Sequence, residues 1–177
     1  LVNAATGLPA LADDTGLEVL HLDLRPGVIS ARYAGENVTY AENNQRLLRE
    51  LEGVPLSRRG ARFRCIAVFT DGEQERLAEG ICHGHIALEL RGGGGFGYDP
   101  LFVPDGYDQT FAELSPAVKN EMSHRAKAFQ RMRLLLRSDL ASGEVGFLPA
   151  TRLSGASLAS VLKFSAELTI LPSIFTT

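Results

Sequence analysis

Two adjacent carboxylates, Asp13 and Asp14, stand before Thr15-Gly16 near the start of the chain. Apolar residues precede them, so the pattern predicts a strand that ends in a turn, where side chains can reach into a cleft. Neighbouring strand residues point to opposite sides. One carboxylate would therefore bind a divalent ion while the other orients the turn, or both would converge where the backbone bends. Mg²⁺ is commonly bound by one or two carboxylates with phosphate oxygens. A turn capped by Asp14, without a ligand, is the alternative.

A second group of residues suits a nucleobase. The glycines at 92–95 and Gly97 leave little steric bulk, so the backbone can approach a ligand and present the Phe96 ring for stacking on a purine. Asp99 precedes Pro100, which holds its backbone extended and fixes the direction of its carboxylate. A structural turn with one aromatic residue is the alternative.

Three cationic or hydrogen-bonding side chains follow this loop: Lys119, His124 and Arg125. We expect His124 and Arg125 to donate to a carbonyl oxygen on a base edge, and Lys119 to meet a phosphate or the base. A donor aimed at a keto oxygen disfavours an amino group at the same place, because neither donor then finds an acceptor. Such a site would separate a 6-keto purine from adenine. A solvated lysine and an ordinary first helical turn are the alternatives.

The elements that position these groups can be predicted from periodicity. The clearest helix spans 39–51, begins with a Thr39–Glu42 capping box and ends before a glycine and a proline. The alternating run 61–70 predicts a strand that enters the middle of a sheet. A turn at Asp71-Gly72 and a return strand over 77–90 complete a hairpin that leads into the glycine run. On one face of this return strand we expect Cys82, Ile86, Leu88 and Leu90.

After the loop, a helix is expected to begin at Ser115-Pro116 or at Ser123. Either start places His124 and Arg125 at or near a helix N-terminus, where free N–H groups favour anions. The residues with helical spacing are Met122, Ala126, Phe129, Arg133 and Leu136. Strands and helices mixed in one compact unit predict the α/β class.

Composition narrows the class of protein. The 177 residues contain 18 Lys and Arg against 21 Asp and Glu, a net charge of -3, which argues against a sequence-independent nucleic-acid surface. Cys65 and Cys82 both lie in apolar, strand-like runs, which indicates reduced core thiols and a cytoplasmic protein. No stretch predicts a membrane span or a signal peptide. The partner expected is a small anion.

Short motifs accompany the residues described above. In chain order they are Leu8-Pro9-Ala10-Leu11-Ala12-Asp13-Asp14-Thr15-Gly16-Leu17-Glu18-Val19, Arg25-Pro26-Gly27-Val28, Ser30-Ala31-Arg32-Tyr33-Ala34-Gly35, Gly95-Phe96-Gly97-Tyr98-Asp99-Pro100-Leu101-Phe102, Thr110-Phe111-Ala112-Glu113-Leu114, Lys119-Asn120 and Ser123-His124-Arg125. This ordered set, over about residues 5 to 135, closely resembles the inosine triphosphate pyrophosphatase family, also called XTP/dITP diphosphatases.

The resemblance implies hydrolysis of deaminated purine nucleoside triphosphates (ITP, dITP, XTP) to the monophosphate and pyrophosphate, which cleanses the nucleotide pool. It implies a Mg²⁺-dependent homodimer with a long mixed central sheet, flanking helices in two lobes and a cleft between them. By motif, Asp14 matches the proton acceptor and metal ligand, with Asp13 beside it as a second metal ligand. The residues that match substrate contacts are Thr15, Phe96, Gly97, Tyr98, Asp99, Lys119, His124 and Arg125, with Phe96 stacking on the base.

The family begins with a strand and a Thr/Ser-Gly-Asn-x-x-Lys phosphate loop, followed by a metal-binding glutamate. This sequence starts at Leu1, close to the two aspartates, so we expect residues 1–137 to form the pyrophosphatase domain without its phosphate-loop segment. Residues 138–177 are expected to form a divergent tail, in which Val161, Phe164, Leu168 and Leu171 share a helical face. Two alternatives are an inactive nucleotide-binding fragment of the same family and a septum-inhibitor-type nucleotide pyrophosphatase.

Overall fold

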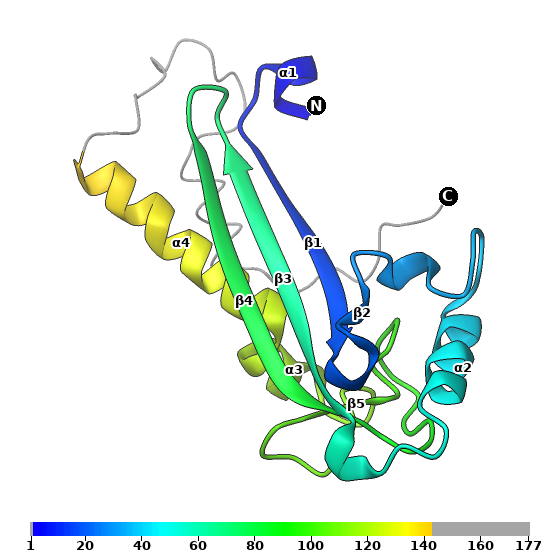
Figure 1. Cartoon of the computed structure of the whole chain (residues 1–177). Helices are drawn as coiled ribbons and strands as arrows, with labels where there is room; N and C mark the ends of the chain where they lie inside the picture. Colours follow the sequence, from blue (N-terminus) through cyan, green and yellow to red (C-terminus); the bar gives the residue numbers. More distant parts are fainter. Residues whose placement is uncertain (1, 143–177) are drawn as a thin grey trace. The chain divides into compact units, whose positions relative to one another are not determined.

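A five-stranded sheet forms the centre of the computed structural model, which describes residues 2–142 (Figure 1). The strand order is β2-β1-β3-β4-β5. The strands are β1 (Ala10–Val19), β2 (Arg25–Gly27), β3 (Gly60–Thr70), β4 (Glu75–Ile86) and β5 (Phe102–Pro104). The helices are α1 (Val2–Thr6), α2 (Tyr40–Glu50), α3 (Pro116–Met122) and α4 (His124–Ser142), with short 3₁₀ turns η1 (Leu20–Leu22), η2 (Ser30–Arg32) and η3 (Leu56–Arg58).

The predicted α/β class is confirmed by this arrangement of strands and helices. Every strand pair within residues 2–142 is antiparallel, however, whereas the resemblance implied a mixed sheet. Figure 1 shows β1, β3 and β4 as three long neighbouring strands, with the short β5 beside the last residues of β4. Asp13 and Asp14 of the first predicted group lie on β1, whereas the second group lies in the loop before β5 and on α3 and α4.

The β3–β4 hairpin confirms the predicted strand over 61–70 and the predicted turn. The Asp71 carboxylate accepts hydrogen bonds from the backbone N–H groups of Glu73 and Gln74, which closes the turn. The return strand ends at Ile86, so the prediction that it reaches residue 90 is wrong. Beyond Ile86 the backbone bonds to the segment before β5 instead, and the side chains of Leu88 and Leu90 are exposed.

Helix α2 confirms the predicted capping box. The Thr39 hydroxyl accepts from the Glu42 N–H, and the Glu42 carboxylate accepts from the Thr39 N–H. Two of the four free N–H groups at the helix start thereby gain partners. Leu47 and Leu51 are fully buried, so one face of α2 packs into the core, as its spacing predicts.

The C-terminal end of α2 is held by a buried arginine. Arg59 is 4% exposed and donates to the carbonyl oxygens of Leu51, Val54 and Ala87. Burial lowers the pKa of its guanidinium. The Leu51 carbonyl oxygen also accepts from the Val54 N–H, but each of the three carbonyls would lose a donor without Arg59, which is costly where the group is buried. Arg59 therefore ties α2 to the segment that follows β4.

Both predicted helix starts are used. The Ser115 hydroxyl caps α3 by accepting from the Val118 N–H, and the Ser123 hydroxyl accepts from the Ala126 N–H at the start of α4. The predicted apolar face of α4 is displaced. Its buried residues are His124, Ala128 and Met132, while Met122, Ala126, Phe129, Arg133 and Leu136 are only partly buried.

This displacement has a steric origin in β4. A side chain at Gly80 would collide with the His124 carbonyl oxygen and the Ala128 backbone nitrogen. The backbone of α4 can therefore lie directly on β4 at this point, and it presents His124 and Ala128 to the sheet. An aromatic cluster continues the contact, since Phe63 lies 4.7 Å from Phe102 and 4.6 Å from His124 between ring centroids.

The compact unit that contains the sheet ends at Met132, and α4 continues past this boundary. The predicted tail lies outside the described residues from 143 onward, and so does its predicted helical face of Val161, Phe164, Leu168 and Leu171. In the described part of the chain, no helix is long and apolar enough to cross a membrane. Cys65 and Cys82 are buried free thiols, as predicted.

Candidate active site

The two aspartates lie inside β1, so the predicted turn after them is wrong. Strand β1 pairs with β3 along its whole length, with Asp13 opposite Ala67 and Asp14 opposite Ile66. Gly16 serves another purpose than a turn. A Cβ placed on Gly16 would lie 2.6 Å from the Gly27 carbonyl oxygen, so the glycine admits the backbone that leads out of β2.

The two carboxylates have different surroundings because neighbouring residues of a strand face opposite sides of the sheet. The Asp13 carboxylate accepts a hydrogen bond from Arg125 Nε at 2.9 Å, and the two side chains form an ion pair. The Cys65 thiol lies 3.5 Å from the same oxygen, and burial raises the pKa of this thiol to about 11, so it remains protonated. Asp13 therefore belongs to the face that carries α4.

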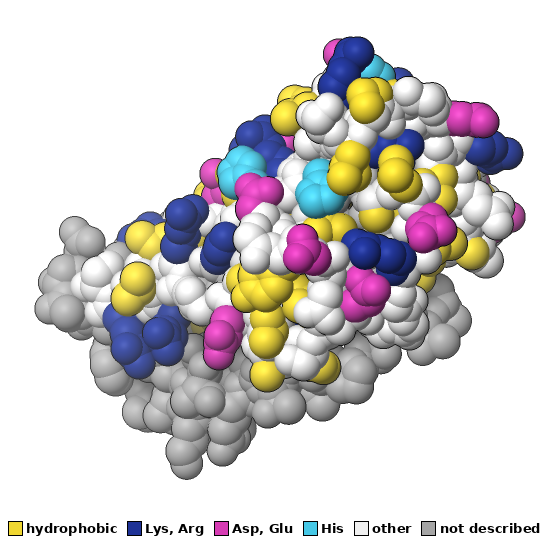
Figure 2. Space-filling view, turned by 90° about the horizontal axis from the view of Figure 1, so that it is seen from below, with side chains coloured by type: hydrophobic (Ala, Val, Ile, Leu, Met, Phe, Trp, Pro, Cys, Tyr) yellow, Lys and Arg dark blue, Asp and Glu magenta, His cyan; other side chains and the backbone are white. Residues whose placement is uncertain are grey.

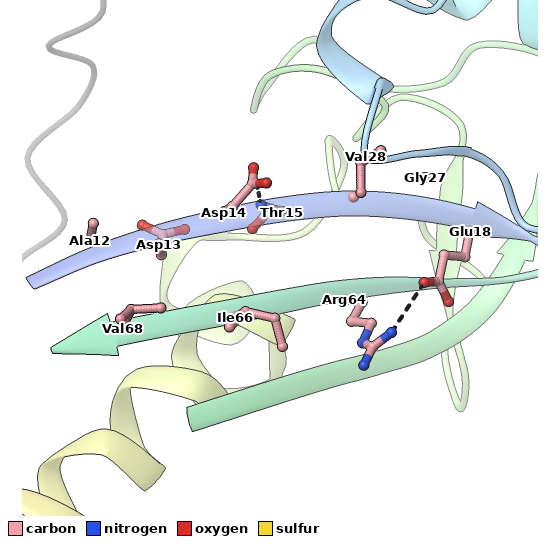
Figure 3. A pocket seen from close by; sticks show the side chains of 11 residues that line it. Ala12, Asp13, Asp14, Thr15, Glu18, Gly27, Val28, Arg64, Ile66 and Val68 are labelled. Carbon is pink, nitrogen blue, oxygen red and sulfur yellow. Dashed lines mark hydrogen bonds and ion pairs between the residues drawn. The ribbon is translucent and has the colours of Figure 1, made fainter. Parts of the chain in front are cut away.

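Asp14 opens onto a pocket of about 500 Å³ on the other face of β1 and β3 (Figure 3). Its Oδ1 accepts from the Thr15 N–H at 2.9 Å. Glu18 in the same pocket is held by Arg62 and Arg64, whereas Asp14 forms no ion pair with any residue in the described range. The pocket lining consists of Ala12, Asp13, Asp14, Thr15, Gly16, Glu18, Gly27, Val28, Arg64, Ile66 and Val68.

The Phe96 ring is the exposed centre of the second group. It is 53% exposed, although large aromatic side chains are usually buried. Lys119 Nζ lies 5.0 Å from the ring centroid, and the Arg125 guanidinium carbon lies 5.8 Å from it. These distances are within the range of a cation–π contact. The ring and both cations thus gather in one place, with part of the ring open to solvent.

Asp99 fixes the turn that carries this ring. It is 3% exposed, and its Oδ2 accepts from the Phe96 N–H at 2.7 Å and pairs with Lys119 at 2.5 Å. Gly95 has a φ of 74°, and a side chain there would collide with the Asp99 carboxylate. The glycine before Phe96 is therefore required by both the backbone conformation and the close approach of Asp99.

Gly97 and Tyr98, which follow Phe96, are hydrogen-bonded to Asn44 and Ser30. The Tyr98 side chain is buried, its hydroxyl donates to the Ser30 carbonyl oxygen at 2.9 Å, and burial raises its pKa. The Gly97 carbonyl oxygen accepts from Asn44 Nδ2 at 2.9 Å. Sequence patterns do not single out Asn44. The signal that could have done so is an amide three residues before the buried Leu47, on the apolar face of α2.

His124 is a neutral histidine at the start of α4. It is 5% exposed and stacks on Phe63, and its Nδ1 has no hydrogen-bond partner among the described residues. Burial, together with the positive charges of Arg125, Lys119 and Lys127, lowers its pKa to about 3. A neutral imidazole carries one N–H group, so His124 offers one donor and one acceptor at neutral pH.

This low pKa gives a prediction for stability. The unfolded chain binds a proton on His124 below about pH 6.5 and the folded chain does not, so the folded state loses stability as pH falls. Between pH 7 and pH 5 the loss attributable to His124 is about 2 kcal/mol. Urea denaturation of the native protein and of His124→Phe at both pH values measures it, because the variant lacks this part of the pH dependence. Equal pH dependence in both proteins would contradict the assignment.

The structure therefore brings together Phe96, Asp99, Lys119, His124 and Arg125, with Asp13 joined to them through Arg125. Asp14 lies on the opposite face of β1 and does not join this contact cluster. Thr15 is opposite Cys65 in the ladder, on the face of Asp13. The arrangement offers an aromatic ring, cations and a neutral donor on one face, and on the other a carboxylate that has no ion pair within residues 2–142.

Comparison with known proteins identifies relatives of this chain. Residues 1–134 match the model of the Ham1 family. The chain is 53% identical over 123 residues to a dITP/XTP pyrophosphatase of Caldanaerobacter subterraneus subsp. tengcongensis, a match that covers 70% of this chain and 62% of that relative. It is 54% identical over 132 residues to a dITP/XTP pyrophosphatase of Desulforamulus reducens, with 74% and 66% covered.

Solved structures agree with this relationship. A HAM1 protein from Coxiella burnetii has a TM-score of 0.70 and 43% sequence identity, over 75% of this chain and 69% of that one. The Staphylococcus aureus Ham1 protein has a TM-score of 0.72 and 36% identity, over 77% and 70%. The chain spans 62% of the length of the Caldanaerobacter relative, which is less than two thirds. With its matched family model and these similarities in sequence and fold, the chain belongs to the Ham1 family.

Proposed function

We propose that this protein hydrolyses deaminated purine nucleoside triphosphates, such as dITP, ITP and XTP, to the monophosphate and pyrophosphate. The observation that carries the proposal is the half-exposed Phe96 ring flanked by Lys119 and Arg125, beside the neutral His124. A purine can stack on the ring while the cations meet its oxygens or the phosphates. The names of the curated relatives, dITP/XTP pyrophosphatases, support the same substrate class.

Discrimination between purines follows from the hydrogen-bonding groups beside the ring. Arg125 is always a donor, and a neutral His124 keeps one N–H across the physiological pH range. When these two groups face a keto oxygen, each donates a hydrogen bond to it. When they face the amino group of adenine, two donors meet and neither finds an acceptor. We therefore assign base selection to His124 and Arg125 and stacking to Phe96.

The two aspartates differ in how well they suit a divalent ion. Asp13 is already neutralised by Arg125, and the described residues contain no group of three or more His, Cys, Asp or Glu side chains that could hold a metal. The Asp14 carboxylate has no ion pair with another described residue and lies beside a pocket of about 500 Å³, which suits Mg²⁺ held by one carboxylate and substrate oxygens. Of the two expected ligands, Asp14 fits the ion better than Asp13. Bound there, Mg²⁺ would neutralise charge on the phosphates.

In the reaction, Asp14 would accept a proton from the water that attacks the α-phosphorus in line. The bond from this phosphorus to the bridging oxygen breaks, and pyrophosphate leaves with the electron pair. The triphosphate then has to reach from the Phe96 side of the sheet to Asp14. Within the described chain, β2 pairs with residues 17–19 of β1 and no strand pairs with the same edge at residues 10–15, so we place the path there.

Charges of both signs are mixed on one face of the molecule. Figure 2 shows acidic and basic side chains interspersed with hydrophobic ones on the face seen from below. The family resemblance supports a cytoplasmic homodimer as the working form, which size-exclusion chromatography with light scattering would test.

An inactive nucleotide-binding protein is the second candidate, since Asp14 is the one unpaired carboxylate in the pocket within the described residues. The test is Mg²⁺-dependent release of pyrophosphate from dITP, with dATP, dTTP and UTP as comparators. Release from dITP well above the others supports the proposal. Binding of dITP without release supports the inactive protein, and preference for dTTP or UTP supports a septum-inhibitor-type pyrophosphatase.

A further inference from the structure

We propose that Asn44 and Ser30 are positioning residues that clamp the base loop, residues 92–100, against helix α2 and strand β1. The inference rests on the proposed function, because it assigns to these residues the placement of the Phe96 ring for stacking. Neither residue carries the ring itself. Each holds the backbone or side chain of a residue that follows Phe96 in the loop.

The first hold is the bond from Asn44 to Gly97. Asn44 is 4% exposed, its Nδ2 donates to the Gly97 carbonyl oxygen at 2.9 Å, and the two residues lie 53 positions apart in sequence. Its Oδ1 is buried without a hydrogen-bond partner in the described part of the chain. A buried acceptor without a donor destabilises the fold. An apolar residue would avoid that cost on this face of α2, so the amide is explained by what its other end does for the loop.

The second hold passes through Ser30. Its carbonyl oxygen accepts from the Tyr98 hydroxyl at 2.9 Å. Its own hydroxyl accepts from the Leu17 N–H at 2.9 Å and donates to the Gly27 carbonyl oxygen at 2.6 Å. One serine thus joins the base loop to β1 three residues after Asp14, and to the end of β2.

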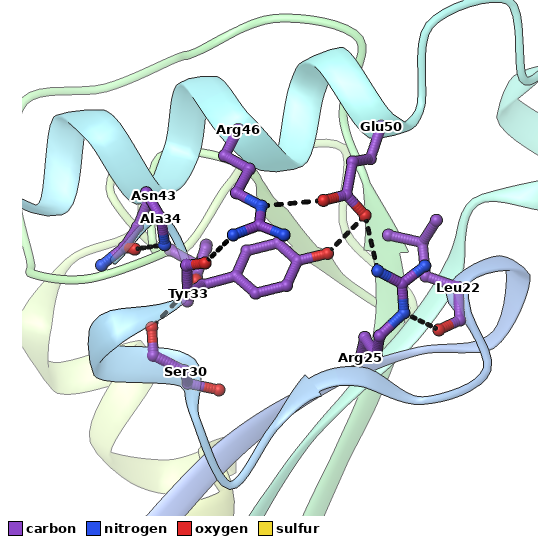
Figure 4. Close-up of polar contacts among 9 residues, drawn as sticks. Leu22, Arg25, Ser30, Tyr33, Ala34, Asn43, Arg46 and Glu50 are labelled. Atoms are coloured by element: carbon purple, nitrogen blue, oxygen red, sulfur yellow. Dashed lines mark hydrogen bonds and ion pairs between the residues drawn. The ribbon is translucent and has the colours of Figure 1, made fainter. Parts of the chain in front are cut away.

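Asn44 and Ser30 lie in two segments that are bonded to each other. Glu50 of α2 accepts from the Tyr33 hydroxyl at 2.6 Å, from Arg46 at 2.8 Å and from Arg25 at 3.0 Å (Figure 4). Asn43 adds two bonds, to the backbone of residues 31 and 34. Helix α2 and the segment around Ser30 are therefore tied together, as Figure 4 shows, and they can act on the loop as a unit.

The exposed state of Phe96 makes such a clamp necessary. An aromatic ring in solvent makes few packing contacts, so its position depends on the backbone on either side of it. Lys119 and Asp99 hold the turn from the α3 side. Asn44 and Ser30 hold Gly97 and Tyr98 from the α2 side, so that the ring is fixed between the two.

The first test compares Asn44→Leu with Gln45→Leu, a matched amide-to-leucine change at the exposed neighbour on the same helix. Hydrogen–deuterium exchange without nucleotide follows the peptide that covers the base loop. Loss of one buried hydrogen bond should speed its exchange about 3- to 10-fold in Asn44→Leu. Gln45→Leu should leave it unchanged. Equal exchange in the two variants would overturn the clamp.

The second test uses the Ser30 side. Tyr98→Phe removes one hydroxyl and should speed exchange of the same loop peptide, and the double variant Asn44→Leu/Tyr98→Phe should multiply the two factors. Ser30→Ala should speed exchange at the Leu17 amide as well as in the loop. The clamp would be refuted if the loop peptide exchanged at the native rate in every variant that folds. A single variant that fails to fold would therefore not prevent the test.

Turnover gives the functional readout. Misplacement of the ring weakens base binding, so the KM for dITP should rise about 3- to 10-fold in Asn44→Leu while kcat changes less than about 2-fold. If Asn44 had only a structural role, Asn44→Leu would lower the active fraction of the protein and therefore kcat instead. Absence of hydrolysis in the native protein would contradict the proposed function, and the exchange results would still decide the clamp.

Discussion

Asp14→Asn is expected to lower kcat for dITP hydrolysis about 10³-fold with little change in stability. Asparagine keeps the size of the side chain and an oxygen that can accept from the Thr15 N–H, the one hydrogen bond found for this carboxylate in the described chain. It removes the negative charge and the proton acceptor. The measurement is steady-state release of pyrophosphate, with urea denaturation to confirm an intact fold.

Asp13→Asn is the matched control, one residue away on the same strand. Its carboxylate pairs with Arg125, so the change should free this arginine and raise KM rather than abolish kcat. Calorimetric titration of dITP with and without Mg²⁺ gives a second readout, in which only Asp14→Asn loses the Mg²⁺-dependent part of the affinity. If Asp13→Asn is the more damaging variant, the roles of the two aspartates are reversed.

Gly80→Ala is expected to destabilise the folded protein by about 3 kcal/mol, as severe overpacking does. The added methyl group meets the His124 carbonyl oxygen and the Ala128 nitrogen, which are backbone atoms and cannot rotate away as a flexible side chain would. The first turn of α4 has to move off β4. Because His124 and Arg125 lie in that turn, discrimination between dITP and dATP should fall together with stability.

Gly93→Ala is the control for stability, because a side chain at Gly93 meets no atom within 4 Å. Urea denaturation of both variants measures the free energies of unfolding, and that of Gly93→Ala should stay within about 0.5 kcal/mol of the native value. A Gly80→Ala protein with native stability would show that α4 does not depend on this close approach. Loss of stability with unchanged base discrimination would show that the helix start can move without consequence for the site.

Local rules explain the elements that could be predicted from the sequence. The Thr39–Glu42 capping box involves residues three apart, and the turn at Asp71 is closed by its own carboxylate. Alternation over 61–70 is visible because β3 has one buried face. In each case the interacting groups are near neighbours along the chain, so their spacing carries the information.

Prediction failed where a distant backbone decides the local structure. Thr15-Gly16 is typical of a turn, yet the strand continues, since Gly16 makes room for Gly27. The buried face of α4 is set by Gly80, 44 positions before His124 in the printed sequence, and not by the periodicity of the helix itself. The end of β4 depends on the segment before β5, to which the chain transfers its hydrogen bonds after Ile86.

The sequence by itself determined the α/β class, the resemblance to XTP/dITP diphosphatases and the types of side chain at the site, because ordered motifs and short-range periodicity are properties of the chain. The tertiary structure alone decided that Asp13 pairs with Arg125 while Asp14 faces a pocket, that His124 is neutral, and that Asn44 and Ser30 hold the base loop. The physical reason is that ion pairing, desolvation and buried hydrogen bonds depend on which residues meet in space. Their partners here lie tens of positions away in sequence.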